Sequence, residues 1–160
     1  PHGTATDKVV DDGDLITFDF VAIYRGYHSD ITLTVAVLSL TERRRFIYVS
    51  VLACHEHIER IMKAGVKACD MDAEARRFLK EKELDIWFIH ALGHSVGLEI
   101  HENPVLAPRD HTVLEENRTE TVEPGVYIPG VGGVRIEDTT VILRDGIRIL
   151  TKFPKALITV

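Results

Sequence analysis

The sequence is poor in cysteine, and it has no long uncharged hydrophobic run. Cys54 and Cys69 are the only cysteines among 160 residues, and they form no C-x-x-C pair. This usage fits a reduced, cytoplasmic setting, although the two thiols could still pair with each other. No stretch approaches the roughly 20 apolar residues of a membrane-spanning helix, and no signal peptide is visible. We therefore expect a cytoplasmic protein with no membrane partner.

An excess of positive charge is also missing. The formal net charge of -6 argues against an extended surface for binding nucleic acid. The densest basic stretch, Arg43-Arg44-Arg45, is too short to be a binding tract, and we interpret it as a solvated helix face. No nucleic-acid partner is expected.

Several familiar catalytic motifs are absent. The run Gly130-Val131-Gly132-Gly133 lacks both the strand-loop-helix context and the lysine of a phosphate-binding loop. The pattern G-x-S-x-G occurs at residues 93–97, but we predict no nucleophile elbow there, and Ser95, directly after His94, is a poor candidate for a nucleophile. Because no glutamate follows His90, the pair His90 and His94 does not form an H-E-x-x-H zinc motif.

Length and composition predict one domain over residues 1–160. The apolar fraction of 45% is ordinary for a globular protein, and a chain of this length can bury well over half of its unfolded surface. The chain begins with Pro1 rather than Met, so we expect a fragment, a processed product or a trimmed chain.

The N-terminal part predicts a β-hairpin followed by a helix. Residues 14–24 and 28–38 are β-rich apolar runs, and the short glycine-containing link between them is typical of a hairpin. Ser39 and Glu42 match a capping box, and apolar residues then recur at helical spacing until Gly65 provides a stop signal.

The remaining chain predicts a second helix and several strands. The second helix starts after Asp70 and runs to about Lys82, and a polar connection is expected over 103–118. Strands are expected near 85–92, 119–128, 133–143 and 147–152. Together these elements predict an α+β fold, in which two helices pack on one face of a curved, mostly antiparallel sheet.

Asp19 and Asp30 lie almost equally far from the hairpin turn, so we expect them to face each other across the two strands. Two neighbouring buried carboxylates would raise each other's pKa, and a cation between them would remove that cost. The alternative is two ordinary acids, each bonded to serine, threonine or backbone.

Three further candidate ligands lie later in the chain, each in a distinctive phrase. His94 lies in G-H-S-V-G-L-E-I-H-E, Glu123 in V-E-P-G and Glu137 in G-V-R-I-E-D-T. With Asp19 and Asp30 they make four carboxylates and one imidazole, a set that suits two hard or borderline divalent cations better than one tetrahedral zinc. Metal-assisted hydrolysis is therefore the leading hypothesis. His55 and His57, by contrast, are interpreted as surface or helix-packing residues.

These phrases resemble the pita-bread metallopeptidases, a family that includes methionine aminopeptidases, Xaa-Pro aminopeptidases, prolidases and creatinase. The resemblance runs from P-H-G-T-A-T-D-K to T-K-F-P-K-A-L. The phrases I-H-A-L-G-H-S-V-G-L-E-I-H-E and G-V-G-G-V-R-I-E-D-T look most like the prolidase and Xaa-Pro aminopeptidase branch. The resemblance implies an incomplete pita-bread fold and hydrolysis of Xaa-Pro bonds in short peptides.

The resemblance also implies a role for each candidate residue. Asp19 would bind one metal ion, Asp30 and Glu137 would bridge both ions, and His94 and Glu123 would bind the other. Glu123 would also act as general base. Catalytic assistance would come from His2, His90 and His101, and His101 and Arg135 would bind substrate. Manganese or cobalt would be the metal, with zinc as an alternative.

The chain departs from the family pattern at several places. It lacks the elements that the family has before P-H-G, Leu33 replaces the usual arginine of S-D-I-T-R-T, and Ser95 replaces a glycine. The polar stretch 116–120 suggests that the strand leading to Glu123 is exposed or that the sequence was altered. The alternative function is therefore an inactive, truncated or redesigned scaffold that binds metal or peptide without cleavage. Uncovered apolar surface also predicts a homodimer or a separate polypeptide that supplies the missing half.

Overall fold

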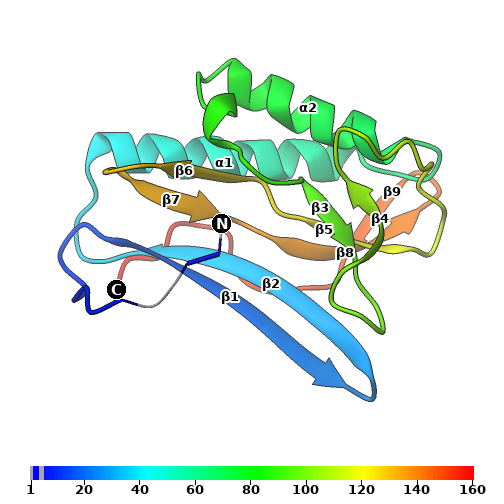
Figure 1. The fold of residues 1–160 in the computed structure, drawn as a ribbon, viewed down its shortest axis with the longest axis horizontal. Helices are drawn as coiled ribbons and strands as arrows, with labels where there is room; N and C mark the ends of the chain where they lie inside the picture. Colours follow the sequence, from blue (N-terminus) through cyan, green and yellow to red (C-terminus); the bar gives the residue numbers. More distant parts are fainter. Residues whose placement is uncertain (1, 4–5) are drawn as a thin grey trace.

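The computed structural model describes residues 2–3 and 6–160. A hairpin, two helices and a set of short strands follow one another along the chain (Figure 1). The elements are β1 (Leu15–Tyr24), β2 (Tyr27–Ala36), α1 (Glu42–Ile61), α2 (Ala68–Lys80), the 3-10 helix η1 (Asp85–Trp87), β3 (Gly93–Ser95), β4 (Glu102–Leu106), β5 (Thr119–Val122), β6 (Gly125–Ile128), β7 (Gly132–Arg135), β8 (Asp138–Leu143) and β9 (Gly146–Ile149).

The strands are antiparallel and form three small sheets. The largest has the order β4-β3-β5-β8-β9, while β1 pairs with β2 and β6 pairs with β7. The two helices lie on one side of these strands, and the β1–β2 hairpin lies on the other (Figure 1). The expected α+β fold with two helices on one face is therefore confirmed.

The predicted hairpin has a two-residue turn. Arg25 and Gly26 both have positive φ, at 51° and 84°, which is the backbone twist that joins two antiparallel strands most tightly. The register pairs Tyr24 with Tyr27 and continues to Leu15 opposite Ala36. Both expected strands are thus present, although β2 ends at Ala36 rather than at residue 38.

The first helix buries the predicted stripe but begins differently. Ile47, Val51, Cys54 and Ile58 are fully buried. The residue that caps the helix is Thr41, whose hydroxyl accepts from the backbone N–H of Arg44. The capping box predicted at Ser39 is therefore wrong.

Ser39 instead binds the Asp12 carboxylate through both its N–H and its hydroxyl. The second helix starts at Ala68, earlier than predicted.

The predicted strand over 85–92 is wrong. Leu84 and Phe88 are buried while Ile86 and Ile89 are exposed, a pattern that no strand alternation produces. The N–H of Trp87 donates to the Leu84 carbonyl and that of Phe88 to the Asp85 carbonyl, so the segment closes a 3-10 turn. The expected connection 103–118 is also partly wrong, because β4 (Glu102–Leu106) begins it.

Two predicted strands are each divided in two. The run 119–128 breaks at Glu123-Pro124 between β5 and β6, and the run 133–143 breaks at Ile136-Glu137 between β7 and β8. Each half belongs to a different sheet. Glu123 uses its N–H to bind the Leu92 carbonyl, and Glu137 uses its own to bind Thr32, so both leave the ladder at the break. The breaks place two acidic side chains where the sheets meet.

The polar stretch before Glu123 is buried rather than exposed at its C-terminal end. β5 lies between β3 and β8, and Glu120 and Thr121 have no exposed surface. The Ser95 hydroxyl donates to Glu120 Oε1 over 2.7 Å, and the Thr140 hydroxyl donates to the Glu120 carbonyl. Burial raises the pKa of Glu120 to about 7. The expectation of an exposed strand is therefore wrong for Glu120.

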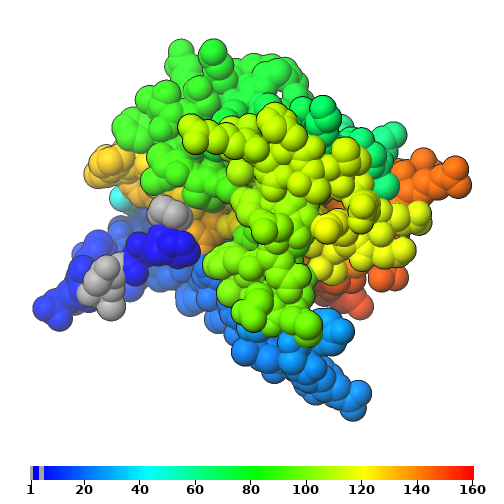
Figure 2. All heavy atoms as spheres, turned by 45° about the vertical axis from the view of Figure 1, so that its right-hand side comes forward, coloured from blue at the N-terminus to red at the C-terminus, as the bar shows by residue number. Residues whose placement is uncertain are grey.

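Apolar side chains remain exposed along the hairpin. Phe20 is 53% exposed, Ile23 65% and Tyr24 72%. The tip of the hairpin protrudes from the rest of the molecule (Figure 2). Across residues 2–3 and 6–160, no helix is both long and apolar enough to cross a membrane.

We predict that Glu120→Gln stabilises the protein at alkaline pH. Burial raises the pKa of Glu120 in the folded state above its value in the unfolded chain, so Glu120 favours the folded state only while it is protonated. The stability of the protein therefore falls as pH rises from about 4.5 through about 7. The amide removes this loss, so its advantage should reach about 3 kcal/mol at pH 8 and vanish near pH 4. Thermal unfolding at both values measures it, with the exposed Glu116→Gln as control. An equal effect at both pH values would contradict the prediction.

Candidate metal centre

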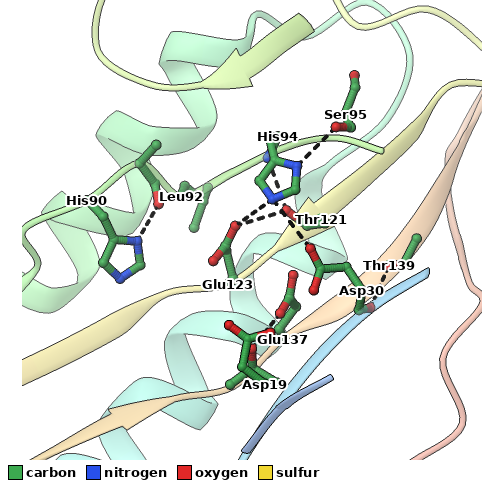
Figure 3. A network of polar contacts seen from close by, with 12 residues as sticks. Asp19, Asp30, His90, Leu92, His94, Ser95, Thr121, Glu123, Glu137 and Thr139 are labelled. Atoms are coloured by element: carbon green, nitrogen blue, oxygen red, sulfur yellow. Dashed lines mark hydrogen bonds and ion pairs between the residues drawn. The ribbon is translucent and has the colours of Figure 1, made fainter. Parts of the chain in front are cut away.

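The five predicted ligands come together in one cavity. They come from three strands and two strand breaks, and their side chains point toward a common centre (Figure 3). His2, His90, His101 and Arg135 line the same cavity, and so do the five candidates Asp19, Asp30, His94, Glu123 and Glu137. All nine residues singled out in the sequence therefore lie around one site.

The hairpin register places its two acids diagonally. Asp19 is opposite Thr32, and Asp30 is opposite Val21. The carboxylates therefore share one face of the hairpin, since side chains two residues apart on a strand point the same way. They are not directly opposite each other, as the simple distance from the turn had suggested. Thr32 fills the position between them and donates its hydroxyl to Glu137 Oε2 over 2.6 Å.

His94 turns one ring nitrogen toward the carboxylates. Its Nδ1 lies 3.0 Å from the Ser95 carbonyl, and this contact favours a proton on Nδ1 and a free lone pair on Nε2. Nε2 lies 3.3 Å from Glu123 Oε1 and 3.6 Å from Asp30 Oδ2. The position of His94 in β3 and the contact of its Nδ1 with the Ser95 carbonyl thus direct Nε2 toward the centre of the cavity.

The buried acids carry negative charge that the described residues only partly offset. Burial and the neighbouring Asp19 raise the pKa of Asp30 to about 6. Burial and the charges of Glu123 and Asp30 raise the pKa of Glu137 well above its usual value. Burial lowers the pKa of His94, but its contacts with Glu123 and the Ser95 carbonyl outweigh this and raise it. Each shift reflects a shortage of positive charge at the centre.

The ligand atoms are close enough to share an ion. One atom each from Asp30, His94 and Glu137 lies within 4.8 Å of the other two. Glu137 Oε1 is buried without a hydrogen-bond partner. A buried carboxylate oxygen without a donor is costly, and a cation at this point would offset that cost.

Arg135 ties Asp19 to the far wall of the cavity. Its guanidinium donates to Asp19 Oδ2 and to the Tyr127 hydroxyl, and its Nε donates to Thr32. The Tyr127 hydroxyl also contacts His90 Nε2 over 3.1 Å. Arg135 is 4% exposed, and the Asp19 side chain 41%. Asp19 is therefore the most accessible of the carboxylates, and it accepts from the Arg135 guanidinium, while Glu123 Oε2 lies 3.9 Å from Arg135 Nε.

The remaining histidines differ in their relation to the centre. The ring of His101 lies edge-on to that of His94, with 4.4 Å between centroids. Burial lowers the pKa of His90, which therefore favours the neutral ring. His57 contacts Glu74 on α2 and packs on Phe78, in agreement with the expected helix packing.

Sequence reasoning missed three polar residues around the centre. Thr32 binds Glu137, Thr121 contacts both the His94 N–H and Glu123, and Tyr127 joins Arg135 to His90. Thr32 could have been found, because it lies on the same hairpin face as Asp30. No sequence signal marks the other two, because strand residues meet such partners only through the tertiary structure.

Comparisons with known proteins show consistent similarity. The model of metallopeptidase family M24 matches residues 1–144. The chain is 47% identical over 158 residues to the Xaa-Pro dipeptidase of Pyrococcus furiosus, covering 99% of this chain and 45% of that protein. The Pyrococcus horikoshii Xaa-Pro dipeptidase is 45% identical over the same length. The chain therefore spans about 45% of the length of these curated relatives.

Solved structures agree with the sequence comparison. The Xaa-Pro dipeptidase of Bacillus anthracis superimposes with a TM-score of 0.97 and 47% identity, over 100% of this chain and 45% of that one. The X-Pro aminopeptidase of Thermotoga maritima gives 0.96 and 42%, over 100% and 46%. The fold is thus part of a pita-bread fold, as the sequence predicts.

We predict that Asp30→Asn stabilises the metal-free protein. The raised folded-state pKa of Asp30 means that stability falls as pH rises from about 4 through about 6, and the amide cannot ionise. At pH 8 with a metal chelator present, the free energy of unfolding of the variant should exceed that of the unmodified chain by about 1–3 kcal/mol. At pH 4 the two should differ little. Calorimetry measures this, and Asp145→Asn at the exposed hairpin tip should change nothing. A destabilised Asp30→Asn protein at pH 8 would refute the prediction.

Proposed function

The chain belongs to metallopeptidase family M24, and on that premise we propose that its cavity hydrolyses Xaa-Pro dipeptides with the help of two divalent metal ions. The convergence of Asp19, Asp30, His94, Glu123 and Glu137 carries the proposal. The named activity of the Pyrococcus relatives, Xaa-Pro dipeptidase, supports the substrate class.

The donor set fits the proposed ions. Four carboxylates and one imidazole suit manganese or cobalt, with zinc as an alternative. The buried Glu137 Oε1, which has no hydrogen-bond partner, would be stabilised by a cation bound beside it. In our proposal Asp19 holds one ion, Asp30 and Glu137 contact both, and His94 and Glu123 hold the other. When bound, the ions would polarise the peptide carbonyl and make water a better nucleophile.

The surrounding residues would prepare substrate and move protons. Glu123 lies at the cavity wall, held by the Thr121 hydroxyl, and we propose that it takes the proton from the attacking water. His101, beside the His94 ring, would bind substrate. His2 and His90 would assist from the same wall, with His90 kept neutral by burial.

Arg135 would act through charge and position. Its guanidinium fixes the Asp19 carboxylate and the Tyr127 hydroxyl, and it adds a buried positive charge beside the substrate. Such a charge favours an anionic group of a short peptide.

We further propose that residues 1–160 act as one domain that associates in a cytoplasmic setting. Phe20, Ile23 and Tyr24 expose apolar surface along β1, whose outer edge pairs with no other strand among the described residues. Apolar surface beside an unpaired edge favours a partner strand or sheet. A homodimer, or a separate polypeptide that completes the shell, would cover it. The two free cysteines favour the reduced compartment.

Hydrolysis of Ala-Pro with added manganese or cobalt tests the proposal. We expect turnover that His94→Ala abolishes, because the loss of its Nε2 removes a ligand. Glu123→Gln should lower kcat by about 10²–10⁴, the usual contribution of a general base. The matched control is His57→Gln, which lies on the outer helix pair and should keep full activity.

Metal content separates the two candidate functions. About two ions per chain, with turnover above that of His94→Ala, supports the peptidase. Bound ions without turnover would favour the scaffold that binds without cleaving, and an absence of both would reject the peptidase.

Sedimentation at micromolar concentration tests the association. We expect a dimer, and Phe20→Glu should shift it toward monomer because a charge replaces buried apolar surface. Glu116→Gln, on an exposed loop away from the hairpin, should leave the dimer unchanged. A clean monomer with a well-dispersed amide spectrum would contradict the prediction.

A further inference from the structure

A second polar cluster lies buried on the helix side of the sheet. His55 and Glu59 occupy successive turns of α1, and Asp138 begins β8. Because neighbouring residues of an extended chain point to opposite sides, Asp138 faces α1 while Glu137 faces the candidate metal centre. The described residues contain two groups of three potential ligands whose atoms converge within 4.8 Å, and this cluster is one of them.

The imidazole of His55 is buried among these acids without a hydrogen bond. His55 has no exposed surface, and neither of its ring nitrogens has a hydrogen-bond partner. Glu59 Oε1 is also buried and partnerless. Histidine nitrogens are normally satisfied when they are buried, so the cluster lacks something that would bind them.

The distances suggest what is missing. His55 Nδ1 lies 3.6 Å from Glu59 Oε2, and Nε2 lies 3.5 Å from Asp138 Oδ2. Both separations are too long for ordinary hydrogen bonds. Each is close to the roughly 3.3–3.5 Å between neighbouring ligands of an ion with metal–ligand bonds of about 2.0–2.1 Å, so an ion on either ring nitrogen would find one carboxylate at this spacing. One atom from each of the three residues lies within 4.8 Å of the other two, which puts the second carboxylate within reach of the same ion after a small side-chain shift.

The charges leave room for a cation. Asp138 Oδ1 accepts from Lys155 Nζ over 2.7 Å and from the Thr151 hydroxyl, while its Oδ2 faces His55 Nε2 and its carboxyl also meets that of Glu59. When Glu59 is ionised, two carboxylates against one ammonium leave about one unbalanced negative charge. Burial raises the pKa of Glu59 to about 7, and burial with Lys155 lowers that of His55 to about 3. The neutral imidazole is the form that binds metal.

The cluster also has an entrance. Glu59, 12% exposed at its side chain, lines a surface cavity with Glu56, Arg60, Ile147 and Ile149. An ion could enter there, and a water molecule from the cavity could complete its coordination.

We propose that His55, Glu59 and Asp138 form a second metal site, separate from the candidate metal centre, that takes a zinc-like borderline divalent cation. One ring nitrogen and one oxygen from each carboxylate supply three ligands, a set that zinc accepts. The ion joins α1 to the first residue of β8 and so braces the strand break that carries Glu137.

Zinc binding to a chelator-stripped His94→Ala chain tests the site, because that background weakens the candidate metal centre. Equilibrium dialysis should show one more zinc per chain in this background than in His94→Ala/His55→Gln. The matched control His94→Ala/His57→Gln changes a histidine two residues away that contacts Glu74, and it should retain the zinc. Glu59→Gln keeps the size of its side chain and should weaken this site by roughly 100-fold or more, beyond the effect of altering groups that only touch ligands.

Ring NMR signals of His55 supply a readout that needs no substitution in the second site itself. Zinc should shift them in the His94→Ala chain and leave those of His57 in place. Equal zinc content with and without His55, unshifted His55 signals at saturating zinc, or a His55 ring protonated at both nitrogens in the presence of zinc would each overturn the proposal. Peptidase activity is measured separately, so failure of this site and failure of the proposed function remain distinguishable.

Discussion

Burial of carboxylates close to one another is the constraint on which the rest of the structure depends. Asp30 and Glu137 sit within reach of His94, and burial with mutual repulsion raises the pKa of both. A chain folded only for stability would replace such groups with apolar residues, because buried like charges are expensive. Their persistence in one cavity is understandable if they bind cations, since the attraction of an ion offsets the repulsion.

The architecture serves this arrangement by dividing long strands. Glu123 and Glu137 each stand at a break between two strands that belong to different sheets. At a break the backbone turns out of one ladder, so the side chain can point into the space where the sheets meet. The hairpin supplies Asp19 and Asp30 from the opposite wall, and α1 and α2 cover the other face of the strands (Figure 1).

Polar burial extends beyond the cavity, and it follows the same strands. Glu120 in β5 is fully buried against Ser95, next to His94, and Asp138 in β8 lies back to back with Glu137. The framework around the candidate metal centre thus carries charged groups on both faces of its central strands. Such a framework gives up stability at neutral pH, and bound cations or protons can restore it.

Much of the fold was predictable from local pattern. Two apolar runs and a glycine-containing link predict the β1–β2 hairpin, and the apolar stripe from Ile47 to Ile58 predicts α1. Short-range signals failed at two places. The apolar run 85–92 suggests a strand, yet two local hydrogen bonds close its first part into a 3-10 turn. Ser39 resembles a cap, yet Asp12 binds it and Thr41 caps the helix.

The sequence by itself determined which residues form the candidate centre and which family the chain resembles, because the types of the ligand residues and the short motifs around them can be read directly from the sequence. Tertiary structure alone decided that Arg135 holds Asp19, that Tyr127 joins Arg135 to His90, and that Glu120 is buried. It also showed that His55, interpreted from the sequence as a surface or helix-packing residue, lies buried between the carboxylates of Glu59 and Asp138. The physical reason is that burial and pairing depend on residues far apart in the chain, and no local pattern records which strand will lie beside which.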